Sequence, residues 1–498
     1  MKNKNLLITI LIIVLSLWSI LPILQPGFFP MHDDTQPARV FEMAKSLKAG
    51  MFPVRWVFDL GYGLGYPIFN YYAPLAYYFG ATFVLLGFDA ITASKIMMGT
   101  GILLSGVFMY LFTKDLWGKL GGIVSAIFYV YVPYHAVNIY VRGAVGEFWA
   151  YAFIPLVFFG LTNIFRTNKL RYVLIGAAGY AGVVLSHNLT ALIITPLVIM
   201  YVFCLSVLAY RGKKYRKIHQ LIAVVVLGFV LSAFYWLPAL AEIKNTNVAS
   251  QLSGGSDFKN NFVCLNQFWN SPWGFGGSTA GCIDGMSFII GKAHILVSIL
   301  SAIAIIALIF LKVKTRKTYF ALGAFAVFIG SIFLMTELSF PIWKSISPMQ
   351  YLQYPWRFLN ITAFSSSILA GLLVWVLGKL FRKNALRYQI HMALFLSILL
   401  LFLNVKYFNA QKIIRVDESY YTSDFNLKWR ISKISDEYLP GNISKPKTAE
   451  DALRNKIIFS FKETPIERFS DYISVAGILA LIAGIIYAQR DAKHKKTS

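Results

Sequence analysis

Two adjacent carboxylates, Asp33 and Asp34, stand where the first long apolar run of the chain ends. The surrounding residues 28–56 read FFPMHDDTQPARVFEMAKSLKAGMFPVRW. A paired carboxylate at such a boundary can act as a general base or bind a divalent cation, and the neighbouring His32 can share a proton or a ligand. In the alternative interpretation, one aspartate caps the helix that follows and the other is solvated.

The residues after the aspartates predict a short helix from Pro37 to a C-terminal cap at Gly50. Apolar and charged side chains recur at helical spacing on two different faces. The apolar set is Val40, Met43, Ala44 and Leu47, and the charged set is Arg39, Glu42, Lys45 and Lys48. We expect this amphipathic helix to lie flat on a bilayer. Both aspartates then fall at its N-terminus, where the helix dipole favours negative charge.

The composition places these residues in a membrane protein. Of 498 residues, 57% are hydrophobic and 14% are charged, whereas soluble domains carry about 25% charged residues. Apolar runs of roughly 20 residues recur without the alternation of a β-barrel. We therefore expect an all-α polytopic membrane protein with about 12 transmembrane helices. The expected helices lie near 5–24, 93–112, 120–136, 148–165, 171–187, 189–209, 218–238, 292–311, 318–336, 359–378, 389–407 and 472–489.

The distribution of positive charge predicts the topology. If the apolar stretch 70–88 does not cross, the loops on the side of the N-terminus hold 24 of the 47 Lys and Arg but only 2 of the 22 Asp and Glu. Cytoplasmic loops collect Lys and Arg, so both termini are expected in the cytoplasm and 70–88 along the membrane surface or re-entrant. The net charge of +25 then reflects topology and not a nucleic-acid partner. The N-terminal run is expected to be a retained signal anchor in the plasma membrane.

This topology divides the chain into three parts. Residues 1–407 form a transmembrane domain whose first outside loop, 25–92, carries the aspartates and juxtamembrane helices. Residues 408–470 form a small extracytoplasmic segment that we expect to be partly β. Residues 471–498 supply the last transmembrane helix and a basic cytoplasmic tail.

Two of the three cysteines, Cys264 and Cys282, share one predicted outside loop. A disulfide between them can form if that loop is extracytoplasmic, because such compartments are oxidising. Cys204 lies inside an apolar run and carries no such indication.

Further ionisable side chains gather near the same outer face. Arg142 and Glu147 lie between two apolar spans, where such groups usually pair or carry function; they could form an ion pair, or Arg142 could hold an anion that Glu147 positions. His187 interrupts an apolar hairpin, either within a tight turn or lining a site. Arg357 stands among aromatic residues as an interfacial anchor or as a phosphate clamp, since guanidinium binds phosphate oxygens bidentately. Carboxylates and arginines converging on one membrane face suggest chemistry on a lipid phosphate.

An ordered set of motifs runs along the chain: HDDTQPARVFEMAKSLKAGMFPVRW, GYGLGYPIFNYYAPLAYYFGA, YVRGAVGEFWAYAFIPL, LSHN, QYPWRFL and FKETPIERFSDYISVAG. In this order they resemble the GT-C superfamily of polytopic glycosyltransferases. More closely, the chain resembles the membrane proteins labelled "6-pyruvoyl-tetrahydropterin synthase-related". The resemblance spans nearly the whole chain and rests on the order of the motifs, since each one alone is weak.

The resemblance implies a hexosyl- or pentosyltransferase of the GT-C type. Such an enzyme moves a sugar from a polyprenyl-phosphate donor to an extracytoplasmic acceptor with inversion. By position, Asp33 or Asp34 would deprotonate the acceptor or hold a divalent cation such as Mg²⁺ or Mn²⁺, and Arg142 and Arg357 would stabilise the leaving phosphate. The contiguous HDD lacks the spaced Asp-x-Asp of some metal-dependent relatives, which puts metal dependence in doubt. Supporting roles are expected for His32, Arg39, Glu147 and His187.

Two other functions compete with this one: a transporter or flippase for lipid-linked saccharides, and a non-catalytic assembly factor. Transporters tend to show paired halves and ionisable groups at mid-membrane. The sequence shows neither an evident repeat nor obvious mid-helix charges, which favours the enzyme over the transporter.

Overall fold

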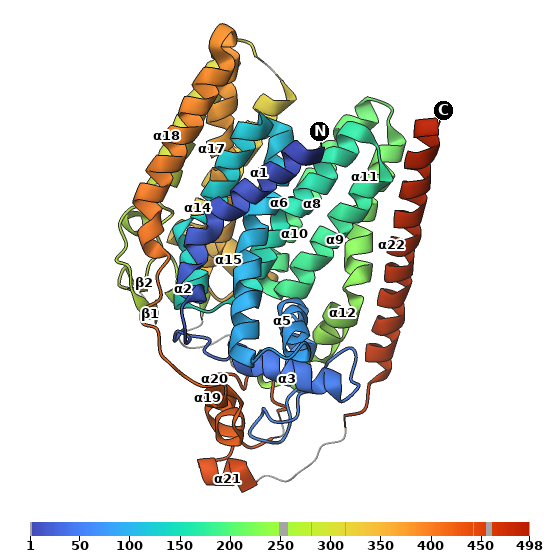
Figure 1. Cartoon of the computed structure of the whole chain (residues 1–498), viewed down its shortest axis with the longest axis vertical. Helices are drawn as coiled ribbons and strands as arrows, with labels where there is room; N and C mark the ends of the chain where they lie inside the picture. The colour runs from blue at the N-terminus through green and yellow to red at the C-terminus, as the bar shows by residue number, and fades with distance from the viewer. Residues whose placement is uncertain are drawn as a thin grey trace. The chain divides into compact units, whose positions relative to one another are not determined.

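The structure is a computed structural model that describes residues 2–248, 257–279, 281–313, 315–441, 443–454 and 461–497 (Figure 1). Helices make up most of this described chain, and its one named sheet is a two-stranded hairpin. The chain divides into two compact units, each assembled from three separate segments. The first unit comprises Met1–Asp33, Met98–Phe148 and Gln251–Arg415, and the second comprises Asp34–Met97, Trp149–Ser250 and Val416–Ser498.

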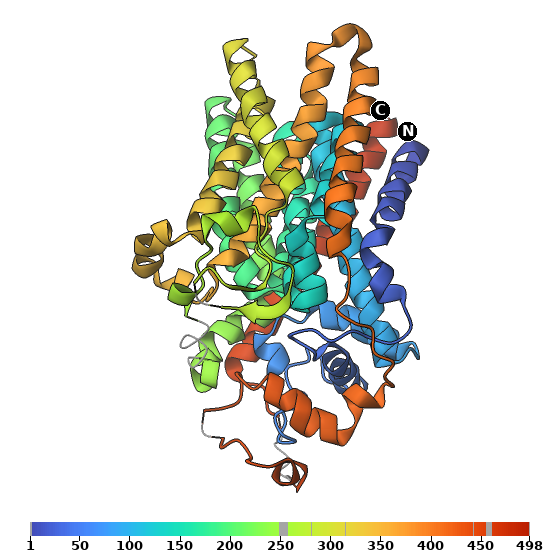
Figure 2. The same ribbon diagram turned by 90° about the vertical axis from the view of Figure 1, so that its left-hand side faces the viewer.

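The first unit is organised around helix α17 (Leu359–Leu380), whose residues 359–376 are all buried. Helices α13, α14 and α18 pack against α17, and the short turn η10 (Arg382–Asn384) joins it to α18, the orange pair at the upper right of Figure 2. Besides α17, the α-helices and strands of this unit and its π-helical turn η2 are α1 (Lys2–Ser16), α2 (Leu21–Leu24), most of α6 (Ala90–Val130), α7 (Pro133–Ala136), η2 (Val137–Val141), β1 (Phe275–Ser278), β2 (Asp284–Met286), α13 (Lys292–Phe310), α14 (Arg316–Met335), α15 (Phe340–Ser345), α16 (Ser347–Gln350) and α18 (Ala385–Asn404).

Small residues let α17 sit at the centre of this unit. A Cβ atom added at Gly371 would lie 2.6 Å from the carbonyl oxygen of Gly121 on α6, so the glycines permit the two backbones to approach closely. Ser366 and Ser367 donate their hydroxyls to carbonyl oxygens one turn earlier in the helix. Their polar groups are therefore satisfied inside the buried helix.

The second unit contains a layer of long helices and a group of short ones. Helix α11 contacts both α9 and α22, and the three run side by side in Figure 1. The elements are α3 (Gln36–Lys48), α4 (Ile68–Tyr71), α5 (Leu75–Leu85), most of α8 (Val145–Thr167), α9 (Leu170–Ser186), α10 (Asn188–Arg211), α11 (Tyr215–Leu231), α12 (Ala233–Glu242), α19 (Ser419–Thr422), η12 (Asn426–Ile431), α20 (Ser432–Ile434), α21 (Ala449–Arg454) and α22 (Pro465–Thr497).

The protein is a multi-pass membrane protein. Among the described residues, nine helices are long and apolar enough to cross a membrane, and a tenth arises if Tyr215–Leu231 and Ala233–Asn245, bent by 68°, form one broken span. The expected single helix 218–238 is thus broken. Helix α6 covers two predicted spans and is non-helical at Gly118, and α9 has only 17 residues. The number of twelve spans therefore stays a prediction.

The length of helix α5 helps to decide whether residues 70–88 cross the membrane. It has 11 residues, which at 1.5 Å per residue reach roughly 16 Å, well short of a hydrocarbon core of about 30 Å. The length of α5 supports the prediction that this stretch does not cross.

Two predictions about polar segments need correction. Helix α3 has nearly the predicted bounds, but its charged face is only partly solvated: Arg39 is 3% and Glu42 0% exposed, whereas Lys45 and Lys48 are exposed. The residue at its N-cap is Thr35 and not an aspartate. In 408–470 the described residues form short helices (α19, α20, α21 and η12), irregular stretches and, beyond isolated bridges at Ile414 and Pro440, no strand.

Candidate active site

The division of the sequence into units falls inside the HDD motif: Asp33 is the last residue of a segment of the first unit and Asp34 the first residue of a segment of the second. In the first unit, the backbone N–H of His32 donates to the Val141 carbonyl (3.0 Å), and that of Asp33 donates to the Arg142 carbonyl (2.9 Å). The partner segment is the π-helical turn η2, a geometry often found at functional sites. The HD dipeptide is therefore aligned by backbone contacts beside Arg142.

A glycine makes this alignment possible. Gly143 has φ +66°, and a Cβ atom there would lie 2.2 Å from the sulfur of Met31. Any larger residue would be strained and would push away the chain that leads into His32. The side chain of His32 is exposed, and its Nε2 hydrogen-bonds the carbonyl oxygen of Phe275 on strand β1 (3.0 Å).

Arg142 and Glu147 form a nearly buried ion pair. The Nη1 of Arg142 donates to Oε2 of Glu147 (2.8 Å), with side-chain exposures of 12% and 1%. The other carboxylate oxygen of Glu147 accepts from the Tyr134 hydroxyl (2.6 Å) and the Asn360 amide (2.8 Å). Burial alone would lower the pKa of Arg142, but the Glu147 carboxylate raises it above its ordinary value. Arg142 therefore stays charged, and its carboxylate partner is held by two further donors.

The two arginines predicted as a phosphate clamp meet on one aromatic ring. The guanidinium carbon of Arg142 lies 4.6 Å from the centroid of Trp356, and that of Arg357 lies 5.9 Å from it. Arg357 donates to the Leu352 carbonyl (3.1 Å), but its buried Nε has no hydrogen-bond partner among the described residues. Glu147 forms an ion pair with Arg142, and the charge of Asp33 also raises the pKa of Arg142. The Nε of Arg357 is the donor that this arrangement leaves for a further anion.

A disulfide secures the loop beside the arginine pair. Cys264 and Cys282 are bonded, as the sequence allowed, and they flank strand β1. The Trp356 indole donates to the hydroxyl of Ser278 on this strand (3.2 Å). The same strand thus contacts His32 through Phe275 and the arginine pair through Ser278.

In the second unit, Asp34 is held by two donors. The Tyr421 hydroxyl donates to its Oδ1 (2.7 Å) and the Arg430 guanidinium to its Oδ2 (3.1 Å). Arg430 also lies over the ring of Tyr420, 3.9 Å from its centroid. Burial raises the pKa of Asp34, against the lowering effect of Tyr421 and Arg430. Asp34 therefore has the surroundings of a fixed structural carboxylate.

Two expected supporting residues also lie in the second unit. Arg39 donates to the hydroxyls of Ser435 (2.9 Å) and Tyr77 (3.3 Å) and joins α3 to the segment after α20. His187 accepts the Thr190 backbone N–H through Nδ1 (3.2 Å) and so caps α10. This contact fits the tight-turn alternative for His187, and a role of either residue toward a substrate stays a prediction.

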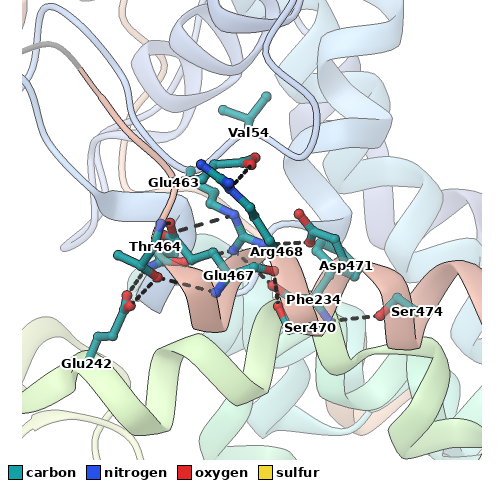
Figure 3. A network of polar contacts seen from close by, with 12 residues as sticks. Val54, Phe234, Glu242, Glu463, Thr464, Glu467, Arg468, Ser470, Asp471 and Ser474 are labelled. Carbon is teal, nitrogen blue, oxygen red and sulfur yellow. Dashed lines mark hydrogen bonds and ion pairs between the residues drawn. The ribbon is translucent and has the colours of Figure 1, made fainter.

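Another buried polar network, which the sequence did not indicate, fixes the start of α22 within the second unit (Figure 3). Arg55 is 2% exposed and pairs with Asp471 (2.6 Å). Figure 3 shows Glu242 of α12 pointing at Thr464, whose hydroxyl donates to it (2.6 Å). The Glu467 carboxylate accepts the Thr464 N–H (2.7 Å) and caps the helix. The buried charges here are paired with each other, so this network holds the start of α22 in place.

The residues do not fit a divalent cation well. Among the described residues no group of three or more His, Cys, Asp or Glu side chains could hold a metal ion. Both oxygens of Asp34 already accept hydrogen bonds, one of them from a cation. We therefore derive no step through the Mg²⁺ or Mn²⁺ considered from the sequence.

The site contains residues that the sequence did not single out. Trp356 stands in the QYPWRFL motif and Asn360 directly follows it. An asparagine at the start of an apolar helix is a usable signal, and Asn360 is buried. Tyr421 and Arg430 lie 387 and 396 residues beyond Asp34, and no local pattern points to them.

The architecture and the comparisons define the class of protein, a membrane protein with the GT-C fold. The structure is similar to the oligosaccharyltransferase of Archaeoglobus fulgidus in its apo form, with a TM-score of 0.50 and 12% identity over 96% of this chain and 64% of that chain. The same enzyme tethered to an acceptor peptide gives a TM-score of 0.50 and 12% identity over 93% and 61%. This chain thus spans less than two thirds of that enzyme.

Residues 69–410 match the model of the 6-pyruvoyl-tetrahydropterin synthase related domain of membrane proteins, and the chain belongs to this family. An uncharacterized protein of Lactococcus lactis subsp. cremoris is 25% identical over 288 residues, which are 55% of this chain and 45% of that protein. The family match includes Arg142, Glu147 and Arg357 but begins after Asp33 and Asp34.

Proposed function

We propose that this protein is an integral membrane glycosyltransferase. It moves a hexosyl or pentosyl group from a polyprenyl-phosphate donor to an acceptor outside the cytoplasm, with inversion. One observation carries the proposal: the guanidinium groups of Arg142 and Arg357 lie over the same Trp356 ring, and the buried Nε of Arg357 has no hydrogen-bond partner among the described residues. Such a pair fits a phosphate that gains charge as it leaves. The GT-C fold supports the same class of reaction.

The two aspartates have different parts in this proposal. Asp33 is the general base, because its backbone is bound to the Arg142 carbonyl in the unit that holds the arginine pair. Asp34 is a positioning residue, because Tyr421 and Arg430 occupy both of its oxygens. It ties the start of α3 to the segment that contains α19 and η12.

The reaction follows from these assignments. Asp33 takes the proton of an acceptor hydroxyl while the acceptor oxygen attacks the anomeric carbon of the sugar. The bond from that carbon to the phosphate oxygen breaks on the opposite face, and its electron pair stays on the phosphate. Arg142 and Arg357 stabilise the added charge. Attack opposite to the leaving group inverts the anomeric configuration.

The topology proposed from the charge bias places this chemistry outside the cytoplasm, with both termini inside. The disulfide between Cys264 and Cys282 supports this orientation, because such bonds persist in oxidising compartments.

The test is a transfer assay with polyprenyl-phosphate sugars on the purified full-length chain, comparing Asp33→Asn and Asp34→Asn. Loss of a general base predicts that Asp33→Asn reduces kcat by roughly 10²–10⁴-fold. Asp34→Asn should retain measurable transfer but melt at a lower temperature, because it weakens a charged contact. Asp424→Asn serves as control, since the side chain of Asp424 is 75% exposed and forms an ion pair with Lys428.

A folded Asp33→Asn variant with full transfer would show that the base is assigned wrongly. Movement of lipid-linked saccharide across vesicles with no transfer product in any variant would favour the flippase instead.

A further inference from the structure

A cavity of about 540 Å³ opens in the first unit where α13 ends, α14 begins and α17 ends. In Figure 2 these helix ends are near the top of the view, with the α13–α14 tip at the upper left and the end of α17 to its right. Four cationic residues line it, and none of its described lining residues is Asp or Glu. The cations are Arg316, Lys317, Lys379 and Arg382. Nothing in the proposed transfer reaction uses this cavity.

Two of the cations are held on one aromatic ring. The ammonium groups of Lys317 and Lys379 lie 5.3 Å and 5.8 Å from the centroid of Trp375. Trp375 is buried with 8% exposure, and Lys317 also donates to the carbonyl oxygen of Leu116. The two lysines therefore lie over the same ring despite their like charge. A bound anion offsets that repulsion.

The rest of the lining is apolar, with Leu308, Leu311 and Leu380 beside the cations. All three helices are candidate membrane spans, so a cavity at their ends lies at the depth of lipid headgroups. The charge bias assigns the loops at this end to the cytoplasm, where the leaflet carries anionic lipids. The lining thus combines a phosphate-binding part with an apolar part for the start of an acyl chain.

We propose that this cavity binds the phosphate headgroup of an anionic phospholipid of the cytoplasmic leaflet. Lys317 and Lys379 contact the phosphate from the Trp375 side, and Arg316 and Arg382 contact it from the two loops. The proposal is independent of the glycosyl transfer, because its test needs no enzymatic activity.

The experiment measures lipid binding to the purified full-length protein by native mass spectrometry. The probes are dioleoyl phosphatidylglycerol, dioleoyl phosphatidylcholine with identical acyl chains, and inorganic phosphate. The test variant is K317Q/K379Q. The matched control is R211Q/R216Q, which removes two exposed cations of another basic loop that do not line the cavity. A second variant, R316Q/R382Q, covers the case in which the lysine variant does not fold.

Wild type should bind phosphatidylglycerol more tightly than phosphatidylcholine. Two lost cations should weaken that binding by roughly 30-fold, whereas the control variant should match wild type. The proposal is overturned if either cavity variant, once folded, binds phosphatidylglycerol like wild type, or if the control loses as much affinity. It is also overturned if inorganic phosphate at equal concentration displaces the lipid, because the ligand would then be free phosphate.

Discussion

Asp33 and Asp34 show what sequence can and cannot give at the scale of a residue. Composition and charge bias indicated that the pair stands at a membrane boundary, but they left the two aspartates indistinguishable. The structure separates them because Tyr421 and Arg430, which hold Asp34, come from the far end of the chain. Long-range partners of this kind leave no local pattern in a sequence.

The arginine pair yields a prediction at the same scale. Arg142→Lys keeps the charge but loses the planar group that lies over Trp356 and donates to Glu147. We expect kcat/KM for the donor to fall by about 10²-fold, the effect of losing one preorganised donor to a developing oxyanion.

Arg171→Lys is the matched control, because Arg171 lies over Tyr172 in the same way (4.7 Å) but is exposed and outside the site. Equal kinetics for the two lysine variants would remove Arg142 from the mechanism.

At the scale of an element, α3 was the part of the first loop that sequence predicted best. Its bounds and its apolar stripe follow from periodicity and from Gly50, both of which are local. The burial of Arg39 and Glu42 was missed, because their partners Ser435 and Asp59 belong to other segments. An amphipathic pattern alone does not tell whether water or protein covers the polar side.

Helix α3 also predicts a pH dependence. Burial, and next the charge of Asp59, raise the pKa of Glu42 from 4.5 to about 8. A carboxyl group whose pKa is raised by folding stabilises the fold below its unfolded pKa, and that contribution is lost as the pH rises through the folded pKa. The melting temperature of wild type should therefore fall between pH 5 and about 8.

Glu42→Gln stays neutral at every pH, so its folded state lacks this contribution. Between pH 5 and about 8, its melting temperature should therefore fall by a few degrees less than that of wild type. Glu450→Gln is the control, since that side chain is 70% exposed. If the melting temperature falls with pH as steeply in Glu42→Gln as in wild type, the raised pKa of Glu42 is not the cause.

At the scale of the whole molecule, the membrane class followed from composition alone, because burying this many apolar residues requires a bilayer. The division into units did not follow. Sequence suggested contiguous parts, whereas each unit combines three separate segments, and α6 and α8 each contribute to both. Contacts between distant segments decide this division, and hydropathy does not encode them.

The prediction that concerns the whole chain is its membrane topology, that is, which loops face the cytoplasm. In a Cys204→Ser background, the cysteine introduced by Lys214→Cys should not react with a membrane-impermeant maleimide in intact cells. It should react after permeabilisation. A cysteine at Lys344, in the predicted outside loop 337–358, should react without permeabilisation; both positions are exposed in the structure. The reverse labelling pattern would mean that 70–88 crosses the membrane.

The disulfide has a consequence for the biogenesis of the protein. Cys264 and Cys282 enclose strand β1, which touches both His32 and Trp356. In the proposed topology, the two thiols pair after translocation in an oxidising compartment, so their pairing is part of the maturation of the site. We expect a chain exported into a reducing medium to insert its helices normally and to acquire its arginine pair, but to leave the neighbouring strand without its covalent tether.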